Sequence, residues 1–196
     1  MTRYWPVTVG RAESIAKINH PPDQPLPGSR LTDPQGLDDL LLYRLYRLLA
    51  VAGEPVTRLC EGVHGITRRE WRLIALLGQQ GAMRSSQLAE RALLDRARTS
   101  KAVSSLVAKG LLSRRAGVGD ARQVVLALTD AGQALHSQVL PQVRAINRQL
   151  LQALSPDAVE QLDHALAALQ QQAGHSGLAA GLPRIGRHRG RPRAGR

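Results

Sequence analysis

Amphipathic helices are predicted at both ends of the central part of the chain. Apolar residues there recur every three or four positions, which places them on one side of a helix. The three rows are Leu37, Leu41, Leu45, Leu48 and Ala52; Leu135, Val139, Val143, Ile146 and Leu150; and Val159, Leu162, Leu166 and Leu169. Pro55 and Pro141 are expected to interrupt or bend the first two helices, and Ser155-Pro156 is a start signal for the third. These faces are candidates for an interface with a second copy of the chain, and the alternative is packing within a monomer.

A shorter helix is predicted to begin after Thr67. Thr67 and Glu70 have the spacing of a capping box, in which both side chains satisfy backbone N–H groups at the start of a helix. Gly78 or Gly81 is expected to end this helix. The side chains expected to face inward are Trp71, Ile74, Ala75 and Leu77.

Residues 84–129 predict two short helices, a turn and a two-stranded ribbon. Ser85 can cap the first helix, whose inward side carries Leu88, Ala89 and Ala92. Asp95 is a good N-cap for the second helix, because its carboxylate can accept hydrogen bonds from the first turn. Gly110 is expected to end the second helix as its C′ residue.

The second of these helices has two chemically different sides. At about 100° per residue, one side carries Thr99, Val103, Leu106 and Val107. The opposite side carries Arg98, Lys101, Ser105 and Lys109, with the small Ala97 and Ala108 between them. Such a face suits the major groove of DNA, where Arg and Lys pair with guanine edges. The same pattern also describes an ordinary solvated helix face.

The ribbon is predicted from the branched residues of 111–116 and 122–128, with the turn supplied by Gly117, Gly119 and Asp120. Arg114, Arg115 and Arg122 lie on or beside this hairpin. An arginine that protrudes from a hairpin tip can enter a narrow minor groove, where the potential is most negative. The predicted fold class is therefore mainly α: a winged helix-turn-helix with a two-stranded β wing, flanked by terminal helices.

These motifs resemble the multiple-antibiotic-resistance regulator (MarR) family of bacterial transcription factors. Asp120-Ala121-Arg122 followed by Leu128-Thr129 resembles the family's wing signature of D-x-R, a short strand and L-T. Residues 86–92 are similar to the family's helix before the turn, and residues 100–112 are similar to its recognition helix. Residues 66–77 are similar to the helix that precedes the DNA-binding unit. Ser100-Lys101 stands where many members carry Thr-Arg.

The resemblance implies a homodimeric, sequence-specific regulator that binds an inverted-repeat operator in double-stranded DNA, in the cytoplasm of a bacterium and with the nucleoid when bound. Helices within 37–61 and 130–172 would form the dimer around a DNA-binding unit at 66–129. The expected base contacts are Arg98, Lys101 and Ser100, and Arg122 would enter the minor groove, oriented by Asp120. The remaining expected DNA contacts, mainly to phosphates, are Ser85, Ser86, Gln87, Arg96 and Arg115.

The resemblance also implies a repressor that is released by a small aromatic or phenolic effector. The effector pocket would lie between the dimer helices and the DNA-binding unit. Its candidate lining residues are His64, Trp71 and Arg72, and the alternative role of Trp71 is plain core packing.

Charge and composition agree with a nucleic-acid partner. The formal net charge is +12, and residues 84–122 carry nine Lys or Arg against three acids. Residues 1–36 hold six of the eleven prolines and predict a weakly ordered lead-in. Residues 173–196 hold six arginines, six glycines and no acid, which predicts a disordered basic tail that binds phosphates or is simply solvated. One domain, 37–172, is expected between them.

Other function classes receive less support. Catalytic motifs are absent and the six histidines lack metal-ligand spacing, so no enzyme, cofactor or metal is expected. Cys60 could sense oxidants only if its thiol pKa were lowered and its side chain reached solvent. The nearby Arg58 would favour a lower pKa, and Glu61 would oppose it.

A DNA-binding architectural protein without sequence preference remains an alternative. An RNA-binding module is disfavoured, because no Tyr or Trp falls in 72–196. No apolar stretch or leader predicts a membrane segment or export.

Overall fold

The computed structural model describes residues 29–117, 120–179, 181 and 183, without the side chains of 116–123, 176 and 179. The predictions for the proline-rich lead-in up to residue 28 and for the basic tail from 184 lie outside these residues. The chain forms two compact units, which meet between Val51 and Ala52.

The first unit contains a 3-10 turn, Leu37–Asp39, and most of helix α1, Leu41–Ala52. The helix predicted from Leu37 therefore starts four residues later. Asp38 and Asp39 lie in the 3-10 turn, where Asp38 accepts a 2.8 Å hydrogen bond from Arg47. Most apolar side chains of α1 are exposed, including Leu42 at 80% and Val51 at 76%, and Leu41 and Tyr43 are half-buried.

The second unit begins with α2, Glu54–Arg58, and a π-helical turn, Leu59–Val63. Pro55 stands in the first turn of α2, and the interruption predicted there is confirmed. Helix α3, Arg68–Gln80, starts with the predicted capping box: Glu70 N donates to Thr67 Oγ1 at 3.1 Å, and Thr67 N donates to Glu70 Oε2 at 2.7 Å. Gly81 ends α3 with φ 76°.

Helices α4, Ser85–Arg91, and α5, Arg96–Ala108, form the helix-turn-helix. The predicted cap of α4 is wrong: Arg84 is the N-cap residue, and its N–H donates to Gln87 Oε1 at 3.1 Å. The cap of α5 is confirmed, because Arg98 N donates to Asp95 Oδ1 at 2.7 Å. Gly110, at φ 70°, ends α5 as predicted, and Leu111 N reaches back to Leu106 O at 2.9 Å.

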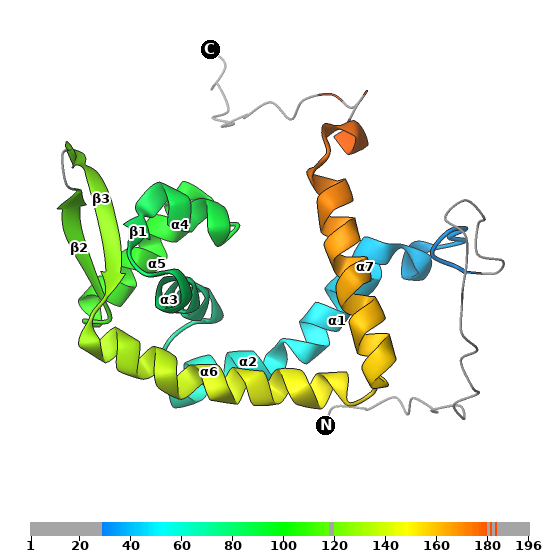
Figure 1. The fold of residues 1–196 in the computed structure, drawn as a ribbon, viewed down its shortest axis with the longest axis horizontal. Coiled ribbons are helices and arrows are strands. Elements are labelled where there is room, and N and C mark those ends of the chain that lie inside the picture. Colours follow the sequence, from blue (N-terminus) through cyan, green and yellow to red (C-terminus); the bar gives the residue numbers. More distant parts are fainter. Residues whose placement is uncertain (1–28, 118–119, 180, 182, 184–196) are drawn as a thin grey trace, which may run out of the picture. The chain divides into compact units, whose positions relative to one another are not determined.

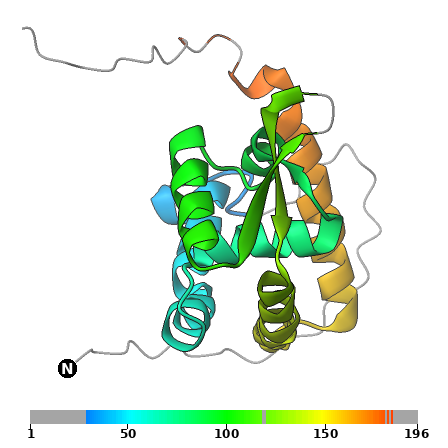
Figure 2. The ribbon, with the colours of Figure 1, turned by 90° about the vertical axis from the view of Figure 1, so that its left-hand side faces the viewer.

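The wing is a three-stranded antiparallel sheet of β1, Met83–Arg84, β2, Leu112–Gly117, and β3, Asp120–Leu128, in the order β1-β3-β2 (Figure 1). The hairpin has the register Leu112↔Leu128 and Arg114↔Leu126. Strand β1 was not predicted, because two residues carry no alternation that could mark a strand. Figure 2 shows the hairpin with α5 at its side.

Two long helices close the chain: α6, Asp130–Leu151, and α7, Pro156–Gly174, followed by a 3-10 turn, Ser176–Ala179. Thr129 and Ser155 cap them, and the start predicted for α7 is confirmed. Pro141 lies inside α6 without ending it.

The core lies in the second unit, between α3, α4, α5, the sheet and the first half of α6. Its fully covered side chains include Leu73, Ile74, Leu88, Leu106, Leu126 and Val139. The fold class predicted from the sequence, a mainly helical winged helix-turn-helix, is confirmed. No helix among the described residues is long and apolar enough to cross a membrane.

Candidate nucleic-acid interface

Helix α5 is anchored by one apolar side and exposes the other. Its buried residues are Thr99, Ala102, Val103 and Leu106, three of which were predicted. The centre of the exposed side carries Ala97, Lys101, Ser104 and Ala108. This centre is rotated by roughly 75° from the predicted row, at about 100° per residue. The prediction that Ser105 and Lys109 belong to the DNA-facing side is therefore wrong.

The rotation has a physical cause in α3. Lys109 Nζ donates to Glu70 Oε2 and to Gly65 O, both at 2.9 Å, and Ser105 is a further hydrogen-bond partner of Glu70. Glu70 is 3% exposed, so its carboxylate needs these donors. The last turn of α5 is thereby attached to the first turn of α3 by an ion pair that the sequence pattern of α5 does not reveal.

The protonation of Glu70 depends on the same contacts. Burial favours the neutral carboxyl, but the hydrogen bonds from Ser105, the Thr67 backbone and Lys109 outweigh it. The pKa of Glu70 is therefore held below its ordinary value. The charged pair persists at neutral pH.

The two cations predicted for base contact differ in their surroundings. Lys101 is exposed at the centre of the outer side of α5. Arg98 is exposed at its edge, where its Nε lies 3.2 Å from Asp95 Oδ2. Because both side chains of this pair are more than half exposed, the attraction is weak, and Arg98 can exchange Asp95 for another acceptor.

The wing contributes one side chain to the same surface. Arg114 of β2 extends over α5, and its Nη2 donates to Ser104 Oγ at 2.8 Å. The sequence placed Arg114 on the hairpin but carried no signal for this contact, which needs the packing angle of strand and helix. Arg115 is exposed, whereas the side chains of Asp120 and Arg122 lie outside the described residues.

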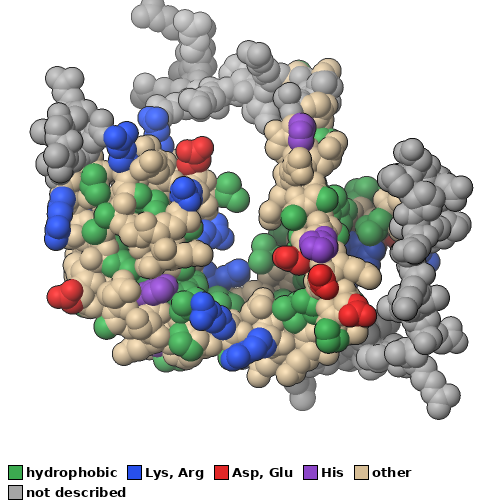
Figure 3. Space-filling view, viewed as in Figure 1, with side chains coloured by type: hydrophobic (Ala, Val, Ile, Leu, Met, Phe, Trp, Pro, Cys, Tyr) green, Lys and Arg blue, Asp and Glu red, His purple; other side chains and the backbone are tan. Residues whose placement is uncertain are grey.

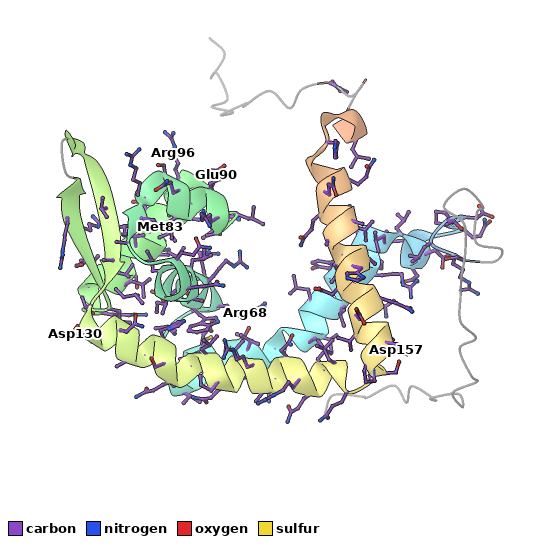
Figure 4. All side chains as sticks on the ribbon, in the orientation of Figure 1. Arg68, Met83, Glu90, Arg96, Asp130 and Asp157 are labelled. Atoms are coloured by element: carbon purple, nitrogen blue, oxygen red, sulfur yellow. The ribbon has the colours of Figure 1, made fainter. Side chains whose placement is uncertain are left out.

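The predicted phosphate contacts of α4 and α5 are at the surface with one exception. Arg96 and Ser86 are exposed, and Ser85 is half-buried. Ser100, which was predicted for base contact, is exposed as well. Gln87 is exposed, but its side-chain oxygen is engaged in the cap of α4. Figure 3 shows Lys and Arg side chains gathered over this part of the molecule, and Figure 4 shows Arg96 directed outward.

The structure does not bring the three candidate effector residues together. His64 lines an open cavity of about 560 Å³ between the end of α5 and the start of α6; its other lining residues include Ile66, Lys109, Leu111 and Leu135. Trp71 is 7% exposed and stacks on His136, with ring centroids 5.9 Å apart. Arg72 Nη1 donates to Ala92 O at 2.9 Å, which ties α3 to the end of α4.

Cys60 is surrounded by the core. Its side chain is 0% exposed, and burial raises the pKa of the thiol, with Arg68 opposing and Glu61 adding to this shift. Arg58, which was expected to favour the thiolate, pairs with Glu54 instead. Both conditions for a reactive cysteine are therefore unmet.

Comparisons with known proteins agree with this geometry. The model of the MarR family matches residues 64–123. The homoprotocatechuate degradative operon repressor of Escherichia coli is 28% identical over 103 residues, 53% of this chain and 70% of that protein.

Solved structures match over a longer part of the chain. A MarR family transcriptional regulator from Silicibacter pomeroyi has 29% identity and a TM-score of 0.62, covering 71% of this chain and 98% of its own. A probable transcriptional regulator from Pseudomonas aeruginosa has 31% identity and a TM-score of 0.59, covering 68% of this chain and 99% of its own. These relatives are transcriptional regulators and not enzymes. With its helix-turn-helix, its wing and these relatives, the chain belongs to the MarR family of DNA-binding transcriptional regulators.

Proposed function

We propose that the protein is a homodimeric repressor that recognises an inverted-repeat operator and is released by a small aromatic or phenolic effector. The observation that carries the DNA-binding mode is the outer side of α5, where Lys101 stands among the small residues Ala97, Ser104 and Ala108. A helix without bulky side chains on this face can approach the floor of a major groove closely.

The proposed contacts divide by function. Lys101 and Arg98 are assigned to base edges, with Ser100 beside them, and Arg122 to the minor groove with Asp120 as its orienting partner. Contacts that position the protein on the phosphates are assigned to Ser85, Ser86, Gln87, Arg96 and Arg115. Phosphate contacts add affinity for any duplex, whereas the base contacts distinguish the operator.

The proposed dimer rests on apolar side chains that stay exposed in the single chain. In α7, Leu162 and Leu169 are 39% and 43% exposed, and in α1, Leu48 and Leu49 are 51% and 58% exposed. A second copy would cover such surfaces, which are costly to leave in water. Two-fold symmetry then requires an inverted repeat with half-sites about 34–36 Å apart.

The proposed effector site is the cavity lined by His64. Its apolar lining residues include Ile66, Leu111 and Leu135, and Lys109 also lines it. A ligand there would contact both α6 and the residue that holds the end of α5, so it can favour one placement of α5 over another. The E. coli relative is named for a degradative operon of homoprotocatechuate, which supports an aromatic acid as the class of effector.

A gel-shift comparison tests the DNA-binding proposal. The duplex upstream of the protein's own coding region is compared with a scrambled duplex of the same composition, at several salt concentrations. We expect the upstream duplex to bind at least 10³-fold more tightly. Equal affinity for both duplexes, with equally steep salt dependence, would instead identify the architectural alternative. That alternative draws support from the net charge of +12.

The effector proposal needs a separate measurement. Homoprotocatechuate is titrated into the preformed complex with the upstream duplex, and the bound fraction is followed by fluorescence anisotropy. We expect release by the wild-type protein and a weaker response from Leu135→Arg, which fills the cavity. Arg72→Ala is the control, because Arg72 binds Ala92 O and does not line this cavity. No release of DNA by any phenolic acid, from protein that stays folded, would reject this part of the proposal.

A further inference from the structure

The outer side of α5 changes in chemistry along its length. Its N-terminal half carries Arg96, Arg98 and Lys101. In the C-terminal half, the whole of which is described, the exposed positions within the helix are the small Ser104 and Ala108. Lys109, the next cation, is turned toward Glu70 and Gly65. Helix α5 therefore brings no cation of its own to the second half of this surface.

Arg114 supplies a cation at this place from another element. Its guanidinium is hydrogen-bonded to Ser104, which lies three residues after Lys101 on the same side of the helix. A guanidinium carries five N–H donors in a planar fork, and the bond to Ser104 engages one Nη group. Arg115 follows Arg114 in β2, and successive side chains of a strand point to opposite faces.

We propose that Arg114 is a specificity-determining residue of the DNA-binding surface, held by Ser104 in one row with Lys101 so that it contacts a base edge in the same major groove. This inference rests on the proposed DNA-binding mode. Guanine is the expected base, because its O6 and N7 accept the two parallel hydrogen bonds that an arginine fork donates. Ser104 is a positioning residue, since it acts through Arg114.

The proximity of Ser104 explains why a wing residue can take part in major-groove contact. An arginine on a free hairpin would lose rotamer entropy when it binds, whereas a hydrogen bond to the helix holds it in place beforehand. The small side chains of Ser104 and Ala108 also leave space for the guanidinium between the helix and the groove.

Selection from a randomised duplex pool tests the inference with the purified full-length protein. We expect the wild-type protein to select an inverted repeat. The variant Arg114→Ala should select the same repeat with one position in each half-site randomised, and bind the best duplex about tenfold or more less tightly. Arg114→Lys should share this loss of preference, because an ammonium cannot form the two parallel bonds. Ser104→Ala should lose part of the preference at the same position.

Arg115→Ala is the matched control, because it removes one positive charge from the neighbouring position of the same strand. It should weaken binding to all duplexes alike and lower the slope of the salt dependence by about one, with base frequencies unchanged. The inference is overturned if Arg114→Ala selects the wild-type motif at every position. If the wild-type protein itself selects no motif, the proposed sequence-specific function fails, and the inference fails with it.

Discussion

Helices α3 and α7 are both amphipathic, yet only one has its apolar side covered. In α3 the row of Trp71, Leu73, Ile74 and Leu77 is buried. In α7 the row of Val159, Leu162, Leu166 and Leu169 also lies along one side of a helix, at intervals of three and four residues, but α7 contains no buried residue. A periodic row therefore identifies the apolar side of a helix, and it does not identify the molecule that covers it.

Helix α6 contains both situations along its own length. In its first half, Gly132, His136 and Val139 are buried against the DNA-binding unit. In its second half Leu150 is 46% exposed, although it continues the same apolar row. The boundary between the packed unit and the surface assigned to a partner thus crosses a continuous helix. This makes α6 suitable to transmit a change of subunit spacing to the DNA-binding unit.

The largest effect is expected from a substitution in the packed core. Leu106→Ala removes a side chain that is 0% exposed and should lower the free energy of unfolding by about 2–5 kcal/mol. Leu169→Ala, at 43% exposed, should cost less than about 1 kcal/mol when the protein is dilute. Urea unfolding measures both, and sedimentation velocity follows dimerisation, which Leu169→Ala should weaken. A large, concentration-independent loss for Leu169→Ala would mean that α7 packs within its own chain.

Removing the Glu70–Lys109 pair tests how much this contact contributes to holding α5 in the packed unit. Glu70→Gln should lower the free energy of unfolding by about 1–3 kcal/mol at neutral pH, because charge-assisted hydrogen bonds are lost. The folded pKa of Glu70 lies below the ordinary value of 4.5, so its carboxylate contributes stability above pH 4.5. This contribution is lost as the pH falls through the folded pKa. The difference between wild type and variant should therefore shrink in acid, as urea titrations from pH 7 to about pH 3 would reveal.

Two glycines test where the packed unit ends. A Cβ on Gly132 would lie 2.1 Å from Leu111 O, so Gly132→Ala should cost about 1–3 kcal/mol through strain at the start of α6. A Cβ on Gly174, at the end of α7, meets nothing within 4 Å. Gly174→Ala should change the free energy of unfolding by less than about 0.5 kcal/mol. Thermal unfolding by circular dichroism distinguishes them, and equal effects would contradict the contrast.

The smallest expected effect concerns the two helix caps. Thr67→Ala and Ser155→Ala each remove a side-chain acceptor at a helix N-terminus, worth about 1 kcal/mol. In α3 the loss should lower the stability of the whole DNA-binding unit, because the helix is part of the core. In α7 it should increase fraying of the first turn only. Amide hydrogen exchange measures both effects, and faster exchange across the core in Ser155→Ala would contradict the prediction.

Local signals in the sequence predicted most of the fold. The Thr67–Glu70 capping box, the Asp95 cap and Gly110 each act within a few residues, so their effect does not depend on the rest of the chain. The same holds for Pro55, which interrupts the helical pattern. The turn predicted for the wing lies partly outside the described residues, at 118–119. Strand β1 escaped prediction because its two residues become a strand only through pairing with β3.

The candidate site was predictable only in part. Lys101 could be assigned to the outer side of α5 from helical spacing alone. The direction of Lys109 could not, because its partner Glu70 lies 39 residues away in the sequence. Arg114 was recognisable as a wing residue, but its position over Ser104 depends on how β2 crosses α5. Trp71 and Arg72 lie in helix α3, which directs them toward His136 and Ala92 O, whereas His64 precedes this helix and lines the open cavity.

By itself, the sequence determined most of the helices, the two strands of the hairpin, the ends marked by capping residues, Pro55 and Gly110, and the segment that concentrates positive charge, since all of these depend on residues close together in the chain. Only the tertiary structure decided that Ser105 and Lys109 turn toward α3 and away from the outer side of α5. A buried carboxylate on a distant helix must be neutralised, and it takes Ser105 and Lys109 for that purpose. The residues on the outer side of α5 that remain for contact with DNA are those that do not bind Glu70.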